Sequence, residues 1–210
     1  MIEFSPVLPD FEHIKRYHDR QRNIIVAKIL PGEFYVTKSS EAISTVLGSC
    51  ISACIWDSKL HIGGMNHFML PIKGDLIGHD GWQHNNSYTC RYGLWAMEYL
   101  INEILKYGGV RQNLQVKLFG GGRVLQNMST DVGEQNIHFA HDYVMNEGLP
   151  IVGSDVGGPW PRKVLFYPDT GKVLVKKLQS THNDTIQRRE RQYRDSLEAP
   201  VQDSAEIELF

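Results

Sequence analysis

The sequence predicts one α/β domain over about residues 23–180, built from layered, mixed β-sheets flanked by two main helices. Short runs rich in β-branched and aromatic residues recur along this region, as expected for strands. Two longer segments instead repeat their apolar residues at helical spacing. Strands and helices follow one another in mixed order, which is typical of α/β and α+β layered domains.

The first half of the domain is predicted to be mostly β-structure. Pro31-Gly32 interrupts one β-rich region, and a turn at residues 57–59 separates two later ones. The predicted strands are residues 24–30, 33–37, 42–47, 51–56 and 62–70. Residues 72–88 are rich in Gly, Asp, Asn and His, which predicts a loop.

The second half contains both predicted helices. The first covers residues 91–107 and should end at Gly108-Gly109, and the second covers residues 133–147 and should end at Gly148. The predicted strands here are residues 114–119, 149–155, 163–167 and 173–178, with the last two forming a hairpin.

The two ends of the chain are predicted to lie outside this domain. Residues 1–22 are polar with some aromatics, which predicts a helical or irregular N-terminal extension. Residues 181–210 form a charged C-terminal tail, in which residues 188–194 would be the solvated face of a helix. Residues 207–210 combine acidic and apolar side chains, a composition suited to docking in a groove of a partner.

Composition narrows the class of protein. Hydrophobic residues make up 41% of the 210 residues and charged residues 22%, enough for a packed core. The net charge of −2 gives no basic face for nucleic acid. No apolar run is long enough for membrane insertion, and the N-terminus has no signal-peptide core, so we expect a cytoplasmic protein. Three cysteines, an odd number, argue against a disulfide framework.

The segment that carries the chemistry is Thr45-Val46-Leu47-Gly48-Ser49-Cys50. A predicted strand leads into a Gly-Ser step and then a cysteine, an arrangement similar to a nucleophile elbow, where backbone N–H groups can face a developing oxyanion. Taken alone, Cys50 could equally be a buried structural cysteine, because free cysteines are among the most buried residues.

His67 favours the catalytic interpretation. It lies in the predicted strand 62–70, which follows the predicted strand 51–56 after a short turn. If these two strands are adjacent, Cys50 and His67 should lie side by side. An imidazole beside a thiol favours a thiolate–imidazolium pair. A hydroxyl should orient the imidazole, and Thr45 is preferred over Ser44. Asn66 should point away from His67 because side chains alternate along a strand.

No metal or organic cofactor is predicted. Cys50 and Cys54 are spaced C-x₃-C without a second pair, which argues against structural zinc. We expect His79 and His84 to be solvated loop residues and Cys90 to be structural. The run 120–122 lacks the Lys-Ser/Thr that follows a phosphate-binding loop, so it should be a turn or a wall of the site.

At this point the residues resemble the CheD family, the chemoreceptor glutamine deamidases of bacterial chemotaxis. The resemblance rests on five ordered blocks that cover about residues 30–178: the Cys50 segment, GGMNHFMLP around His67, Tyr92-Gly93 with Ala96-Met97, LFGGG with Gly133, Asn136 and Phe139, and DVGG with Arg162-Lys163-Val164 and TGKV. Departures from the family pattern are Gly122, where alanine is common, and Pro159-Trp160-Pro161 before Arg162.

The resemblance implies a CheD-like fold and an activity. Such proteins hydrolyse glutamine side chains of methyl-accepting chemotaxis receptors to glutamate, and they can bind a CheC-like phosphatase. Carried over, Cys50 is similar to the family nucleophile, His67 to its base and Thr45 to the supporting hydroxyl, with Ser44 left open because the family spacing varies by one residue. The alternatives are a binding regulator of a CheC-type phosphatase, and a cysteine protease or transglutaminase with the same pair. The receptor glutamines that are chosen and the oligomeric state are not predicted.

Overall fold

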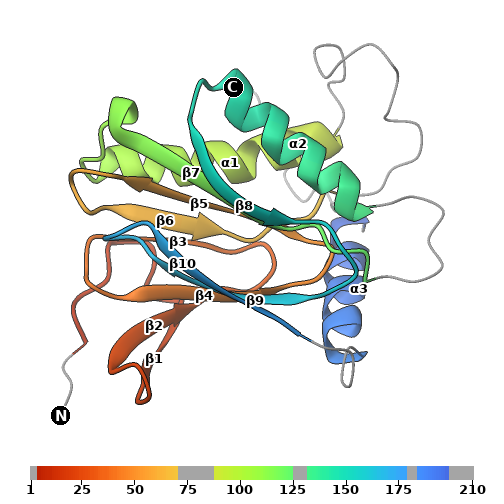
Figure 1. Cartoon of the computed structure of the whole chain (residues 1–210), viewed down its shortest axis with the longest axis horizontal. Coiled ribbons are helices and arrows are strands. Elements are labelled where there is room, and N and C mark those ends of the chain that lie inside the picture. The colour runs from red at the N-terminus through yellow and green to blue at the C-terminus, as the bar shows by residue number, and fades with distance from the viewer. Residues whose placement is uncertain (1–3, 71–87, 125–131, 179–183, 199–210) are drawn as a thin grey trace, which may run out of the picture.

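Two five-stranded β-sheets form the centre of the molecule (Figure 1). The computed structural model describes residues 4–70, 88–124, 132–178 and 184–198. The first sheet has the order β1-β2-β4-β9-β10 and the second has the order β3-β6-β5-β7-β8. Both are mixed, because β2–β4 and β7–β8 are parallel pairs and the other pairs are antiparallel.

The elements follow the chain in this order: β1 (Lys15–Asp19), β2 (Ile24–Lys28), β3 (Phe34–Thr37), β4 (Ala42–Leu47), β5 (Ile51–Asp57), β6 (Gly63–Asn66), α1 (Tyr88–Lys106), the 3₁₀ turn η2 (Arg111–Asn113), β7 (Leu114–Gly120), α2 (Val132–Asn146), β8 (Ile151–Val156), β9 (Arg162–Tyr167), β10 (Lys172–Lys177) and α3 (Asp184–Glu198).

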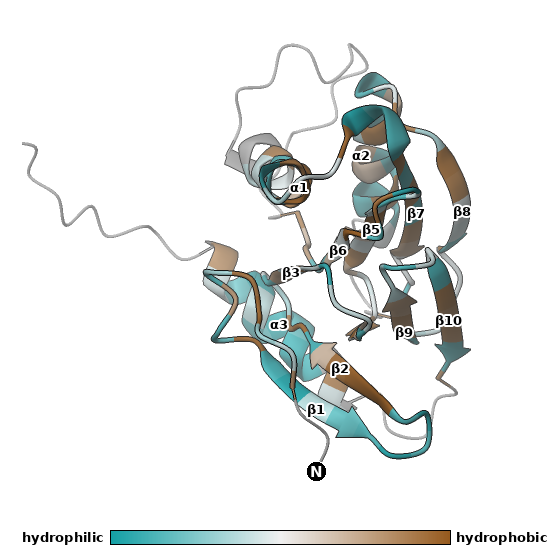
Figure 2. Ribbon diagram, turned by 90° about the vertical axis from the view of Figure 1, so that its left-hand side faces the viewer, coloured by the Kyte–Doolittle hydropathy of each residue, from teal (hydrophilic) through white to brown (hydrophobic). Residues whose placement is uncertain are grey.

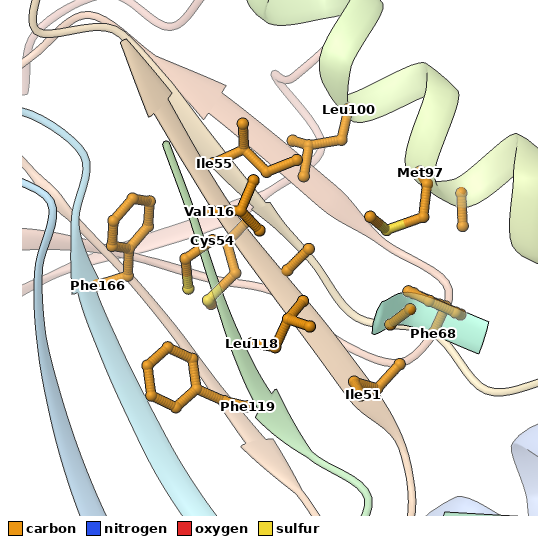
Figure 3. Packing of buried hydrophobic residues seen from close by; sticks show 14 of the residues in the cluster. Ile51, Cys54, Ile55, Phe68, Met97, Leu100, Val116, Leu118, Phe119 and Phe166 are labelled. Carbon is orange, nitrogen blue, oxygen red and sulfur yellow. The ribbon is translucent and has the colours of Figure 1, made fainter. Parts of the chain in front are cut away.

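The second sheet lies in the middle of a layered arrangement (Figure 2). Helices α1 and α2 cover one of its faces, and the first sheet covers the other. In Figure 3, Met97 and Leu100 of α1 approach Ile55 from one side, while Phe166 of β9 approaches Cys54 from the other. Every residue of β5 is buried as a result. Removing one such large apolar side chain from water contributes about 1.5–3 kcal/mol to the free energy of unfolding.

The segment that joins β4 to β5 passes from one sheet to the other. It contains Gly48, Ser49 and Cys50. The predicted elbow is therefore one of the covalent crossovers between the two sheets, held by the packing of both.

The predicted α/β architecture, both helices and the strands of the domain are confirmed to within a few residues. The largest difference is in β6, which ends at Asn66, and Phe68 continues the pairing with an isolated bridge to Ile51. The predicted loop at 72–88 falls almost entirely outside the described residues, and α1 begins at Tyr88.

The N-terminal extension contains a strand that the sequence did not indicate. Lys15–Asp19 form β1, which pairs antiparallel with β2, instead of a helical or irregular lead-in. Its sequence, KRYHD, does not show the alternation of apolar and polar residues that identifies a strand. Most of its side chains are half-buried in the structure. None of the helices within the described ranges is long and apolar enough to cross a membrane.

Candidate active site

The backbone around Cys50 is fixed from a neighbouring strand end. The Cys50 carbonyl accepts a hydrogen bond from Gly121 N–H at 2.7 Å, and the Gly48 carbonyl accepts one from Gly122 N–H at 2.7 Å. Gly120 has φ +117°, and a Cβ on it would meet the Cys50 carbonyl oxygen. The triple glycine is thus a strand-end turn that packs directly on the elbow, as the sequence suggested.

His67 lies on the same face of the second sheet as Cys50. Asn66 donates through Nδ2 to the Ala96 carbonyl of α1 at 3.0 Å, so it points toward the helices. Since side chains alternate, His67 points to the opposite face, toward the first sheet. The predicted antiparallel pairing of the two strands is confirmed, and its register places Cys50 and His67 diagonally across it.

Thr45 is the hydroxyl that contacts the imidazole. Its Oγ1 lies 2.7 Å from His67 Nδ1 and donates its one proton to the Ile29 carbonyl at 2.9 Å. The hydroxyl oxygen must then accept from Nδ1–H, which leaves Nε2 with a free lone pair. Within the described residues Nε2 has no hydrogen-bond partner. The imidazole is therefore held in the tautomer that can accept a proton.

Burial keeps both groups uncharged. Cys50 is completely buried and His67 is 2% exposed. Burial, reinforced by the nearby carboxylate of Glu190, raises the pKa of the Cys50 thiol well above 9. Burial lowers the pKa of His67 from 6.5 to about 3. Both pKa shifts favour a neutral thiol and a neutral imidazole over the expected thiolate–imidazolium pair while the site is buried in this way.

A third side chain, Glu190 of α3, occupies the elbow, and sequence reasoning missed it. Its carboxylate accepts hydrogen bonds from Gly48 N–H at 2.8 Å, Ser49 N–H at 3.0 Å, the Ser49 hydroxyl at 2.7 Å and Cys50 N–H at 3.3 Å. Three successive backbone N–H groups that converge in this way form an anion-binding concavity. The sequence shows Glu190 only as one charge in an arginine-rich run.

Asn136 and Arg162 support the elbow from behind. Asn136 is fully buried in α2, accepts from Leu70 N–H at 2.8 Å and donates to the Ser49 carbonyl at 2.9 Å. Arg162 of β9 is 1% exposed and donates to the Gly120 carbonyl at 2.9 Å. Both residues occur in the sequence blocks singled out above, but their contacts depend on strands and helices far apart in the chain.

The remaining cysteines and histidines considered in the sequence are either buried in the core or outside the described residues. Cys54 is buried in the core opposite Phe166 (Figure 3). His79 and His84 lie outside the described residues, and so does the side chain of Cys90. Among the residues that the structure describes, no cluster of three or more His, Cys, Asp or Glu side chains is arranged to hold a metal ion.

Comparison with known proteins identifies the family of the chain. A sequence model described as CheD chemotactic sensory transduction matches residues 69–177. The chain is 53% identical over 205 residues to a probable chemoreceptor glutamine deamidase CheD of Halorhodospira halophila, with 97% of this chain and 93% of the relative covered. The chain belongs to the CheD family. CheD relatives from Saccharophagus degradans and Hahella chejuensis are 45% and 46% identical, and the matches cover 98% and 97% of this chain and 94% and 93% of the relatives.

The extent of these matches bears on the site. The match to the CheD family model begins at residue 69 and so does not include the elbow or His67. The CheD relatives match over nearly the whole chain, which includes those residues and most of the C-terminal region. Membership of the CheD family therefore rests on the whole domain, and the assignment of the site rests on the geometry described above.

Proposed function

We propose that this CheD-family chain is a protein-glutamine deamidase that acts on the cytoplasmic regions of methyl-accepting chemotaxis receptors. The names of its relatives, probable chemoreceptor glutamine deamidases, support the substrate. The observation that carries the proposed chemistry is the elbow, where three backbone N–H groups converge at Cys50. His67 lies diagonally across the strand pair from Cys50. Acyl transfer needs a nucleophile, a base and donors for an oxyanion, and Cys50, His67 and the N–H groups of the elbow are the groups that we assign to these roles.

In the proposed mechanism, Cys50 Sγ attacks the side-chain carbonyl carbon of a receptor glutamine while its proton passes to His67 Nε2. The N–H groups of Gly48, Ser49 and Cys50 hold the oxyanion. The imidazolium then gives the proton to the departing ammonia as the C–N bond breaks, which leaves a thioester. Water, deprotonated by His67, hydrolyses the thioester to glutamate and regenerates the thiol. Thr45 keeps the imidazole in the correct tautomer throughout.

Ammonia release from purified receptor cytoplasmic fragments, followed by peptide mapping, tests this proposal. We expect selected glutamines to gain about 1 Da while the receptor chain stays intact, since an amide is exchanged for a carboxylate. Cleaved or cross-linked receptor would instead indicate a protease or a transglutaminase.

Cys50→Ala should abolish this activity. Cys54→Ala is the matched control, because Cys54 is equally buried but lies within β5, four residues beyond the elbow. Full ammonia release by Cys50→Ala would rule out the proposed nucleophile. Loss of activity in both variants with unchanged folding would show that the reaction does not depend on Cys50 alone.

A second candidate function is binding and regulation of a CheC-type phosphatase. The complete burial of Cys50 in this conformation favours a role that does not require access to the thiol. The two functions are separated by measuring, for the same Cys50→Ala variant, both receptor deamidation and the regulation of a CheC-type phosphatase. If the variant regulates a CheC-type phosphatase as the wild type does, binding is an activity of its own.

A further inference from the structure

Helix α3 places a carboxylate, that of Glu190, on the elbow, and the following inference from this contact rests on the proposed function. The product of glutamine deamidation is a glutamate side chain, and Glu190 presents that same group to the elbow. All three N–H groups that would hold the oxyanion are bonded to its carboxylate, and so is the Ser49 hydroxyl. Glu190 itself is only 3% exposed, so this carboxylate is taken out of water together with the site.

The rest of α3 makes a narrow contact with the domain. One turn beyond Glu190, the ring of Tyr193 lies against Gly32, where a Cβ would come within 3.1 Å of the ring. The Tyr193 hydroxyl is hydrogen-bonded to the Tyr92 hydroxyl of α1. The charged and polar residues between and before them are exposed, namely Arg188, Arg189, Arg191 and Gln192. Figure 1 shows α3 at one end of the two sheets, where it lies outside both layers.

The consequence is a closed site. Gly48 has no room for a side chain, because a Cβ there would lie 2.6 Å from a carboxylate oxygen of Glu190. A substrate carbonyl oxygen needs the same donors, and Cys50 is completely buried. A receptor glutamine and Glu190 therefore compete for one position.

We propose that α3 is an internal inhibitor of the deamidase, in which the Glu190 carboxylate stands in for the product glutamate and must leave the elbow before a receptor glutamine can bind. The docked and undocked forms are two states of one chain. Anything that prefers the undocked form, a receptor above all, shifts the population toward the active state.

The accessibility of the Cys50 thiol tests the docking independently of any receptor. We expect Glu190→Ala in the full-length chain to increase the rate of Cys50 alkylation by iodoacetamide by about 10-fold or more, because release of α3 exposes the thiol. Tyr193→Ala should act in the same direction by removing the second anchor. The control is Asp195→Ala, since Asp195 is an exposed acid on the same helix. The alkylated residue is located by peptide mapping, and circular dichroism confirms the fold.

The outcomes separate this inference from the proposed function. If neither Glu190→Ala nor Tyr193→Ala alkylates faster than Asp195→Ala, the inhibitory role of α3 is wrong. If alkylation accelerates and ammonia release from receptor fragments also rises, the inference is supported. A fall in ammonia release in Glu190→Ala despite faster alkylation would mean that Glu190 assists the reaction, which would overturn it. Faster alkylation with no receptor deamidation by any variant or the wild type would refute the proposed function alone.

Glu190→Gln tests the role of product mimic directly. This substitution places an amide in the elbow of the same chain, where its effective concentration is high. We expect Cys50-dependent hydrolysis of that amide, which consumes one water, releases one ammonia and adds about 1 Da at position 190. Gln192, exposed on the same helix, serves as the internal control, and Glu190→Gln combined with Cys50→Ala should not convert. If position 190 is not converted, although a separate sample of the same variant shows normal reactivity of the Cys50 thiol toward iodoacetamide, Glu190 does not occupy the product position.

Discussion

At the scale of single residues, the hydrogen bond between Thr45 and His67 determines which imidazole nitrogen can accept a proton. Thr45 Oγ1 donates to the Ile29 carbonyl and therefore accepts from Nδ1. The proposed base, which follows β6 of the second sheet, thus depends on a backbone carbonyl directly after β2 of the first sheet.

Thr45→Val removes this hydroxyl with little change of shape. We expect the rate of receptor deamidation to fall about 10- to 100-fold, because a buried hydrogen bond worth about 1–3 kcal/mol is lost and the imidazole can rotate. Ser44→Ala is the control, since Ser44 is also buried in β4 and its side chain alternates with Thr45 to the other face of the strand. Equal losses in the two variants, measured as ammonia release per enzyme, would contradict the special role of Thr45.

The burial of His67 predicts a specific dependence of stability on pH. Because its pKa is lowered from 6.5 to about 3, the unfolded chain binds a proton below pH 6.5 that the folded chain does not. The free energy of unfolding should therefore fall by about 2 kcal/mol from this group between pH 7 and pH 5. Urea unfolding at both pH values should show a smaller loss in His67→Gln. An unchanged loss would mean that His67 is not buried as a neutral group.

At the scale of elements, the elbow depends on contacts made by α2 and by the end of β7. Asn136 of α2 bonds to backbone groups on both sides of the site, and Gly120 closes β7 against Cys50. These contacts tie the position of Cys50, the proposed nucleophile, to elements that carry none of the proposed reacting groups.

Asn136→Ala should destabilise the fold by about 2–4 kcal/mol, because it leaves a buried N–H and a buried carbonyl without partners. His138→Ala, an exposed change on the same helix, should shift the free energy of unfolding by no more than about 0.5 kcal/mol. Chemical denaturation measures both. A cost in Asn136→Ala as small as that of His138→Ala would show that the bridge is not structural.

Gly120→Ala and Gly108→Ala separate backbone strain from crowding. Both glycines have positive φ, +117° and +104°, but nothing lies within 4 Å of a Cβ at Gly108. We expect a cost of about 1 kcal/mol at Gly108 and more than about 2 kcal/mol at Gly120, where the new methyl group also meets the Cys50 carbonyl. Similar melting temperatures for the two variants would argue against close packing of β7 on the elbow.

Much of this arrangement could be predicted from sequence because the signals are local. The strand before Cys50, the strands on either side of residues 57–59 and both main helices follow from periodicity and turn residues. Strand β1 could not be predicted in this way, because its residues do not alternate and only its pairing with β2 makes it a strand. Glu190 was missed for a similar reason: it lies 140 residues from Cys50, and nothing in the surrounding charged run distinguishes it as a buried acid.

At the scale of the whole molecule, the layered domain and α3 should differ in stability. The central strand β5 is buried along its whole length, whereas α3 lies outside both layers and contacts the domain through Glu190 and Tyr193. Segments with few buried contacts open without global unfolding. Hydrogen exchange monitored by mass spectrometry should therefore show α3 exchanging at least about 100-fold faster than β5. Equal protection of α3 and β5 would mean that the helix leaves only when the whole chain unfolds.

The passage of the chain from β4 to β5 has a consequence for protein engineering. Cys50, the proposed nucleophile, lies in the segment that joins β4 of the first sheet to β5 of the second. Substitutions that shift it would therefore disturb the packing of both layers. The side chains of α3 that contact the elbow and its surroundings, Glu190 and Tyr193, belong to a helix that lies outside both layers. A designer who wishes to redirect such an enzyme to new proteins should leave the crossover unchanged and vary that helix.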